Sequence, residues 1–451
     1  MQVKIKFNIV FFISCLIFFL FRLLAFIQTN PGFDTYDSPS YFNPTWTSPI
    51  RMPLISYLFT YLGYFGAINL VQTFIGIGSW IFLAYSIANL TPNVRLKIFA
   101  TIITFSLGVS SPIVAFDSII LSESLTISIF NLVVGFILLF FHNSTVLRIL
   151  GISISLIIYS GLKQSNAHLS LILVIPILFF ILKEHRKDTR FKSFIFIIAS
   201  TLILNIFFVW IARQNDEINS NVEVTNIIER SFDTFESQNW WLDKGFPGIA
   251  YQAYSSPPYQ PPIDTTRALP QVKAWEIFEK NSPIELFALS HIDYLVLAPI
   301  LPRYFIPHFT DFESIYSPLS RGYRMDQNRL VTNLVSGKVE PFFLENLNLP
   351  TTFWWQTESE KSKLLFLLLL LPIILYTYKS TRREGVINLG VARSVFLLVS
   401  FTLMAIWANW HISVNYEMAR YLMPWAIAMR ILFIICTIAL IDNLRKREIS
   451  S

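Results

Sequence analysis

The sequence predicts an all-α integral membrane protein with about ten transmembrane helices. Of its 451 residues, 53% are hydrophobic and only 14% are charged, whereas soluble domains are nearer a quarter charged. Several apolar runs exceed the 18 or so residues that cross a bilayer as a helix. These runs are continuous rather than alternating, which indicates helices and not the strands of a membrane β-barrel.

Charge and cysteine usage narrow the class of protein further. The formal net charge of +6 does not indicate nucleic acid as a partner, because the lysines and arginines lie largely in short gaps between apolar runs, where they set orientation. The two cysteines, Cys15 and Cys436, both lie inside apolar runs, so no disulfide framework is expected. The first apolar run is too long for a signal peptide and no cleavage site follows it, so we expect an uncleaved span.

Residues 1–212 form the first predicted unit, an N-terminal transmembrane module. A first outer loop is expected at residues 28–53, followed by a short amphipathic helix along the membrane surface at about residues 54–65. Arg22, near the outer end of the first span, is expected to reach the interface by snorkelling. The expected spans are at about residues 7–27, 67–90 and 98–115, then one ending near 141, then 149–160, 169–182 and 193–212.

Residues 213–362 are predicted to be an outer-face insert, and residues 363–451 a C-terminal transmembrane module. The insert is expected to carry interfacial helices, one of them at about residues 284–309, where prolines and charged residues interrupt an apolar stretch. Basic gaps such as residues 183–192 are typical of the cytoplasmic side, which places the insert and residues 28–53 outside. The expected C-terminal spans are near residue 364 and at about residues 394–410 and 422–441.

The first outer loop contains a stiff, polar stretch at residues 31–53. Five prolines in this stretch disfavour regular helix and strand. The loop carries the carboxylates of Asp34 and Asp37, and further along it has Tyr41 and Arg51. Carboxylates at a membrane boundary are costly to keep near hydrocarbon, which makes them candidates for function. A turn or capping role, common for Asp-Ser-Pro, is the alternative.

The sequence has no motif for nucleotide chemistry. It lacks both G-x-x-x-x-G-K-[ST] and G-x-G-x-x-G, the motifs of many ATP and NAD sites. No His/Cys cluster has zinc-ligand spacing, and no G-x-S-x-G elbow is present. The expected cytoplasmic gaps are too short to build a nucleotide-sugar domain. An activated donor would therefore reach an outer-side site through the membrane, and a lipid-linked phosphate suits that route.

The outer side collects the acids and cations that transfer from a lipid-linked phosphate requires. A carboxylate would take a proton from the acceptor hydroxyl, and cations would stabilise the departing phosphate. The candidate acids are Asp34, Asp37, Asp117 and Glu123, and the candidate cations are Lys163, Arg303, His411 and Arg420.

Several of these residues also have a structural alternative. Glu123 begins a span, where acids favour the first helical turn in any case. Lys163, at the tip of a hairpin of two spans, equally fits an interfacial anchor. Arg420 suits a bidentate phosphate contact, but it also fits a plain helical pair with Glu417. A lone interfacial histidine such as His411 is usually structural.

Four stretches resemble segments of the GT-C superfamily of membrane glycosyltransferases, in the order in which that superfamily has them. The first outer loop, DSPSYFNP followed by SPIRMPLISYLF, has an acid, then a tyrosine, then an arginine–proline turn that enters a short surface helix. The second acidic loop is FDSIILSESLTISIF, and the later basic hairpin is GLKQSNAHLSLILVIP. A late segment, NYEMARYLMPWAI, is similar to the E-x-x-R-Y-x-x-P segment of protein-mannosyltransferases and aminoarabinose transferases.

This resemblance implies a GT-C fold and an inverting transfer that depends on a polyprenyl phosphate. It implies a catalytic aspartate in the first loop, and the position before Tyr41 assigns that role to Asp37. Many members have an adjacent Asp-Glu pair, whereas Asp34 and Asp37 are three apart, so Asp34 remains an alternative base. Asp34 and Glu123 are expected to shape the acceptor side or to bind a divalent metal.

The sequence-based hypothesis is a glycosyltransferase that moves a sugar from a polyprenyl phosphate or diphosphate to a hydroxyl acceptor. The acceptor would be a glycan, a lipid or a protein at the outer face of the plasma membrane. Arg420, with Lys163 or Arg303, would hold the lipid phosphate. Substrate contacts are also assigned to Tyr41, Arg51, Glu417 and His411. The alternatives are a transporter or flippase of a lipid-linked glycan and a noncatalytic subunit of a glycan assembly complex.

Overall fold

The computed structural model of this chain is all-helical over the residues that it describes. Every regular element in that part of the chain is a helix, as the apolar runs predict. The structure describes residues 2–28, 38–46, 51–63, 65–117, 120–212, 214, 243, 281, 354, 371–372, 374–375, 427–428 and 430–442.

Five helices in these ranges are long and apolar enough to cross a membrane. The helices are α1 (Gln2–Gln28), α3 (Phe65–Ala88), α6 (Glu123–His142), α8 (Gln164–Glu184) and α9 (Phe191–Ala212). Their spanning segments run from 19 to 23 residues, which matches the thickness of a bilayer's hydrocarbon core. The chain is therefore a multi-pass membrane protein. Most of the C-terminal spans expected from the sequence lie outside the described residues.

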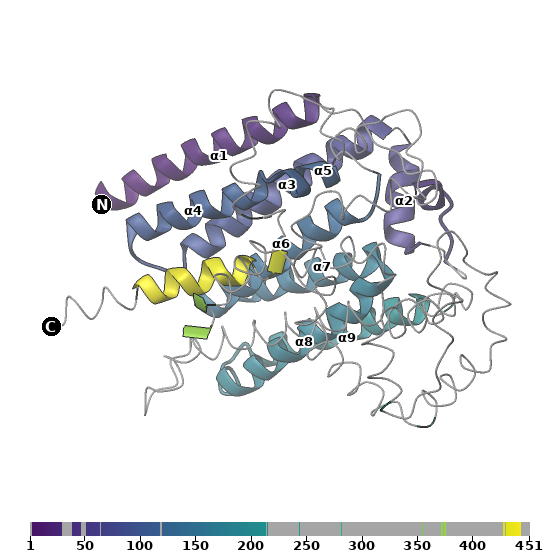
Figure 1. Cartoon of the computed structure of the whole chain (residues 1–451). Coiled ribbons are helices and arrows are strands. Elements are labelled where there is room, and N and C mark those ends of the chain that lie inside the picture. Colours follow the sequence, from purple (N-terminus) through teal and green to yellow (C-terminus); the bar gives the residue numbers. More distant parts are fainter. Residues whose placement is uncertain are drawn as a thin grey trace.

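The helices pack as a layered bundle in the order of the chain (Figure 1). Helix α1 packs on α3 and α4 (Val94–Gly108), and α3 packs on α6. Next comes α7 (Val146–Leu162), which contacts α6 on one side and both α8 and α9 on the other. Helices α7 and α8 form the hairpin predicted from the sequence. The core is thus built from α3, α6 and α7, and α6 is its most enclosed spanning segment, with 89% of it buried.

The third span expected at residues 98–115 is interrupted, which corrects the sequence prediction. Helix α4 ends at Gly108 and the separate helix α5 covers Ser111–Asp117. Pro112, in the first turn of α5, has no amide hydrogen to continue the α4 ladder. A Cβ on Gly108 would lie 2.9 Å from Trp80, so the chain at this break packs closely against α3. The break directs Asp117 into the bundle.

Helix α2 (Pro53–Leu62) crosses the end of the bundle rather than running along it (Figure 1). It starts at Pro53, whose fixed φ suits a first helical position, and it ends at Gly63 in the left-handed conformation with a φ of 61°. Helix α2 packs on α7 and on the short 3₁₀ helix η1 (Ser38–Phe42). This crossing is the arrangement expected for the predicted surface helix.

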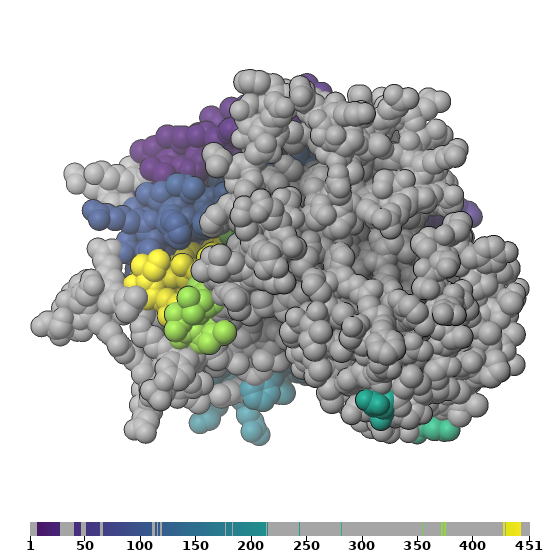
Figure 2. All heavy atoms as spheres, in the orientation of Figure 1, coloured from purple at the N-terminus to yellow at the C-terminus, as the bar shows by residue number. Residues whose placement is uncertain are grey.

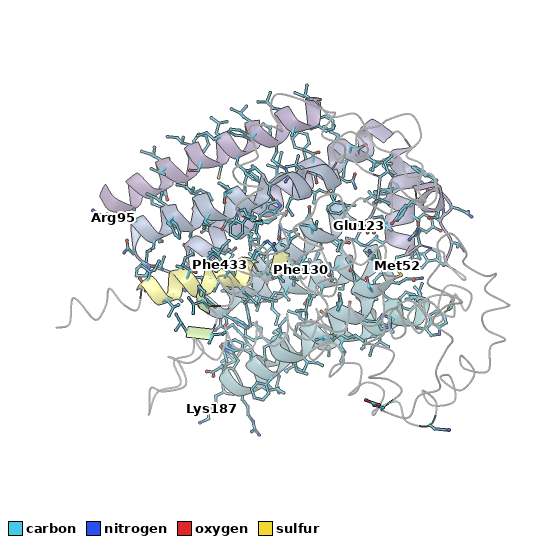
Figure 3. The ribbon with its side chains drawn as sticks, viewed as in Figure 1. Met52, Arg95, Glu123, Phe130, Lys187 and Phe433 are labelled. Atoms are coloured by element: carbon cyan, nitrogen blue, oxygen red, sulfur yellow. The ribbon has the colours of Figure 1, made fainter. Side chains whose placement is uncertain are left out.

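The basic gaps that fall within the described residues lie at the same end of the bundle, opposite the α2 end. Figure 3 places Arg95 and Lys187 at one end, and Glu123 and Met52 at the other. Two loops touch at the basic end, where the Arg190 guanidinium donates to the Ser144 carbonyl at 2.5 Å. Hydrogen bonds from Arg190 also hold the pKa of Asp188 below its ordinary value.

The described part of the last expected span joins this bundle. Residues 430–442 form a helix whose atoms lie beside those of α4 in Figure 2. Asp442 accepts a hydrogen bond of 2.9 Å from Thr91, just before α4. Arg430 donates to the Trp354 carbonyl at 2.7 Å, and the Trp354 indole donates to Ser106 of α4 at 2.9 Å. Segments more than 240 residues apart thus pack together.

Candidate functional site

The candidate site lies at the α2 end of the bundle, where three segments meet. These are the first outer loop with η1, the start of α6, and the junction of α7 with α8 (Figures 1 and 3). Four residues predicted from the sequence, Tyr41, Arg51, Glu123 and Lys163, lie together there, linked by the contacts below. We call this group the outer-loop cluster, using the side predicted from the sequence for its name.

Glu123 and Lys163 form the central ion pair of the outer-loop cluster. The Lys163 Nζ lies 2.9 Å from Glu123 Oε1, and the side chains are 16% and 4% exposed. Glu123 is the first residue of α6, where the unpaired amides of the first turn favour a carboxylate. Lys163 is the single extended residue between α7 and α8, with φ −150° and ψ 144°, so the break in the hairpin presents its side chain to α6.

Tyr41 connects the first outer loop to the start of α6 through Ser122. The Tyr41 hydroxyl donates to Ser122 Oγ at 3.1 Å and accepts from the Ser122 amide at 3.3 Å. Ser122 Oγ in turn donates to Glu123 Oε2 at 3.4 Å. Tyr41 is only 1% exposed. The hydroxyls therefore form a chain that ends on the Glu123 carboxylate, opposite the oxygen that Lys163 contacts.

Arg51 closes the first outer loop over Tyr41. Its guanidinium carbon lies 4.9 Å from the centre of the Tyr41 ring, a distance at which a cation is attracted to an aromatic face. Its Nε also donates to Ser40 Oγ at 2.7 Å. Arg51 directly precedes Met52 and Pro53, where α2 begins. The arginine–proline turn singled out in the sequence thus holds the tyrosine that contacts α6.

A second buried ion pair lies next to the outer-loop cluster and joins Arg22 to Asp117. Arg22 is 1% exposed, so the expectation that it snorkels to the interface is wrong. Its guanidinium reaches inward because its two terminal nitrogens donate there, one to Asp117 and the other, at 2.5 Å, to the Gly108 carbonyl. Asp117 also accepts a 2.6 Å hydrogen bond from Ser124. Both oxygens of this candidate acid are therefore engaged inside the bundle.

Two amide side chains of α3, which the sequence motifs did not single out, lie in the same region. Asn69 donates to the Asp117 carbonyl at 2.8 Å, and Gln72 donates to the Leu121 carbonyl at 2.9 Å. They are three residues apart and therefore share a face of α3. The detectable signal was two amide side chains within an otherwise apolar span, since polar groups inside a bilayer require partners.

No protein-family model matches this chain. No curated protein and no solved structure matches it either. The GT-C resemblance therefore depends on the sequence motifs alone, and any function has to be argued from the side chains that the fold brings together.

Six of the predicted site residues lie outside the residues that the structure describes, so their positions remain predictions. They are Asp34, Asp37, Arg303, His411, Glu417 and Arg420. Among the described residues, no group of three His, Cys, Asp or Glu side chains could hold a metal ion. The predicted metal site includes Asp34 and therefore stays a prediction.

The outer-loop cluster combines the chemical groups that anion and hydroxyl recognition require. It has two cations, one carboxylate and a phenol, drawn from three separate stretches of the sequence. Arginine and lysine suit phosphate oxygens, while carboxylate and phenol groups suit the hydroxyls of a sugar or an acceptor. The position of the cluster at one end of a bundle of apolar helices would give a lipid-borne phosphate access from the bilayer.

Proposed function

We propose that this protein is an inverting glycosyltransferase of the GT-C type. It moves a sugar from a polyprenyl-phosphate or polyprenyl-diphosphate donor to a hydroxyl acceptor at the outer face of the membrane. The acceptor is a glycan, a lipid or a protein. The four resembling motifs support this class of reaction, as does the predicted topology, whose cytoplasmic gaps are too short for a nucleotide-sugar domain.

The observation that carries the proposal is the convergence of three of the four motifs. The acid–tyrosine–arginine loop, the second acidic loop and the basic hairpin meet in the contacts among Tyr41, Ser122, Glu123 and Lys163. The order of these motifs along the chain does not by itself bring them together in space. A shared active site requires that they lie together. Asp37 lies four residues before Tyr41 in the sequence, within the same motif.

The proposed roles follow from charge and position. Asp37 takes the proton from the acceptor hydroxyl, with Asp34 as the alternative base. Arg420, together with Lys163 or Arg303, holds the lipid phosphate as negative charge develops on it. Glu123 orients Lys163 through their ion pair and shapes the acceptor side. A divalent metal held by Asp34 and Glu123 is a further element of the proposal.

The outer location is supported by the distribution of charge over the two ends of the bundle. Arg95 and Lys187 mark the end opposite Glu123 (Figure 3). Basic gaps favour the cytoplasmic side, so the outer-loop cluster would face outward, away from soluble nucleotide sugars. A donor that already carries its sugar on a membrane lipid meets this requirement.

The test is turnover by the purified protein in liposomes. The vesicles would contain polyprenyl-phosphate sugars and, separately, diphosphate-linked sugars, with lipid and glycan acceptors analysed by mass spectrometry. Asp37→Asn should abolish transfer while folding is retained. Asp188→Asn, which changes an aspartate at the opposite end of the bundle, serves as the matched control and should keep transfer. Wild-type activity in folded Asp37→Asn would exclude Asp37 as the base, and absence of turnover on every donor would exclude the transferase.

One feature favours transport as a second candidate function, namely the buried Arg22–Asp117 pair within the bundle. Ionisable groups inside spans often mark ion or substrate paths. Arg22 lies midway between Ile17, the middle of the first spanning segment, and its end at Ile27, about 8 Å from each, whereas transporter sites usually lie at the midplane itself. A liposome counterflow assay that shows solute movement without a covalent product would establish transport.

A further inference from the structure

The start of α6 is held from two sides by two different ion pairs. Glu123 contacts Lys163 at the α7–α8 junction, and the next residue, Ser124, donates to Asp117 at 2.6 Å. Asp117 is in turn paired with Arg22 of α1. The outer-loop cluster and a second charged pair, which belongs to other helices, are therefore attached to adjacent residues of α6.

Asp117 is bonded through each of its oxygen atoms. One carboxylate oxygen contacts Arg22, the other accepts from Ser124, and the main-chain carbonyl accepts from Asn69 at 2.8 Å. Gln72, one turn along α3 from Asn69, supports the Leu121 carbonyl two residues before Glu123. These bonds join α1, α3 and α5 to the residues that lead into α6.

The packing of α3 leaves room for this pair at one glycine. A Cβ on Gly76 would lie 2.7 Å from the Arg22 guanidinium nitrogen and 3.5 Å from both carboxylate oxygens of Asp117. A side chain there would force the guanidinium to shift. By contrast, a Cβ on Gly78, on the same helix, would meet nothing within 4 Å.

A buried ion pair is not needed for stability alone. Replacing both members of such a pair by apolar residues is often neutral, because desolvation of the two charges offsets their attraction. A pair of this kind can nevertheless fix one arrangement of the chain, since its bonds have direction and a unique partner. Of the bonds that Asp117 makes, the one from Ser124 reaches the first turn of α6.

We infer that Arg22 and Asp117 are positioning residues that fix the first turn of α6 and so place Glu123 against Lys163. The expected consequence, a loss of turnover, rests on the proposed transferase function. The placement itself is independent of the reaction. Neither residue contacts substrate. They act through Ser124 and the backbone that precedes Glu123.

The test uses the full-length protein with the double substitution Arg22→Met and Asp117→Leu. Removing both charges leaves neither member unpaired, so the bundle should fold. Hydrogen exchange of the peptide that covers residues 120–126 should rise, while exchange in α9 stays at the wild-type level. With a donor on which the wild type is active, kcat should fall by about tenfold or more, with a smaller change in the donor KM.

Two further variants separate positioning from a general structural role. Arg22→Lys keeps a cation opposite Asp117, so its kcat should be close to the wild-type value. The kcat of the single variant Arg22→Met should be clearly lower. Arg148→Met is the matched control, because Arg148 supports the other end of α6 by donating to the Leu139 carbonyl at 2.7 Å. It should lower thermal stability and leave exchange at residues 120–126 and kcat unchanged.

Unchanged exchange at residues 120–126 in the folded double variant would overturn the inference, as would wild-type kcat. If the double variant does not fold, Gly76→Ala displaces the Arg22 guanidinium with both charges kept, and the same two readouts decide. A wild type without turnover on any donor would remove the transferase proposal only, because hydrogen exchange still measures whether the pair holds the start of α6.

Discussion

At the scale of single residues, the Glu123–Lys163 pair decides how the candidate site should be interpreted. The sequence assigned Glu123 to an acid role and Lys163 to phosphate binding as if they were separate. The structure joins them at 2.9 Å, with both side chains largely buried. A phosphate that approaches Lys163 therefore meets a cation already oriented by a carboxylate.

Removing Lys163 should destabilise the protein more than removing an exposed lysine. Lys163→Met leaves the buried Glu123 carboxylate without the cation that it contacts, a loss that we expect to cost about 3 kcal/mol. The exposed Lys192 in α9 offers the control, and Lys192→Met should change the free energy of unfolding by less than about 0.5 kcal/mol. Denaturation in detergent, followed by tryptophan fluorescence, measures both.

Adding Glu123→Leu to Lys163→Met should recover much of that stability, because neither charge is then left unpaired. If the double variant is as unstable as Lys163→Met alone, the ion pair is not the cause of the loss.

Two glycines of α3 give a second comparison at the residue scale. Gly76→Ala should destabilise the protein by about 1–3 kcal/mol, because the new Cβ would lie 2.7 Å from the Arg22 guanidinium. Gly78→Ala meets open space and should be neutral or stabilising by up to about 1 kcal/mol, since alanine favours a helix. Equal effects of the two substitutions on thermal unfolding would show that Arg22 is not confined at Gly76.

At the scale of elements, the helices follow from the apolar runs, but their contacts and one interruption do not. The runs predicted α1, α3, α6 and α9 because a helix satisfies its own backbone in lipid. The break between α4 and α5 lies inside an apolar run, at Pro112, and it brings Gly108 close to Trp80 and Phe18. Composition within one window carries no signal of that contact.

The candidate site shows the same division between local and non-local information. Motifs singled out Tyr41, Arg51, Glu123 and Lys163, but spacing along the chain could not pair them across helices. The Arg22 partner was missed for the same reason. A useful rule was available, since an arginine well inside an apolar run has to find an acid or a carbonyl, and Asp117 was one of the few acids next to a span.

The contact between α3 and α6 makes a prediction for helix packing. A Cβ on Gly135 of α6 would lie 2.7 Å from the Phe82 ring and 3.1 Å from Ser86 of α3. Small residues let membrane helices approach closely, so Gly135→Ala should cost about 1–3 kcal/mol. Adding Phe82→Leu should restore part of the loss in the midpoint of thermal unfolding. Absence of any rescue would mean that Gly135 does not set this distance.

At the scale of the whole molecule, the bundle has two chemically different ends. Basic gaps gather at one end, while the outer-loop cluster and α2 lie at the other (Figure 3). The positive-inside rule therefore predicts that the cluster faces outward. This polarity is what a lipid-linked donor and an extracytoplasmic acceptor would require.

Thiol labelling in intact cells tests that orientation. In a background with Cys15 and Cys436 replaced, Trp46→Cys, at a position that is 47% exposed, should react with a membrane-impermeant maleimide. Lys187→Cys, at the opposite end, should react only after the cells are permeabilised. The reverse pattern would place the outer-loop cluster in the cytoplasm and end the case for a lipid-borne donor.

The bond from Arg190 to the Ser144 carbonyl ties the turn after α6 to the turn after α8. The helical hairpins α6–α7 and α8–α9 are therefore fastened at their basic ends, and at the opposite end the single residue Lys163 joins α7 to α8. With a bond at one end and the chain itself at the other, these two hairpins are expected to move as one body rather than to separate sideways.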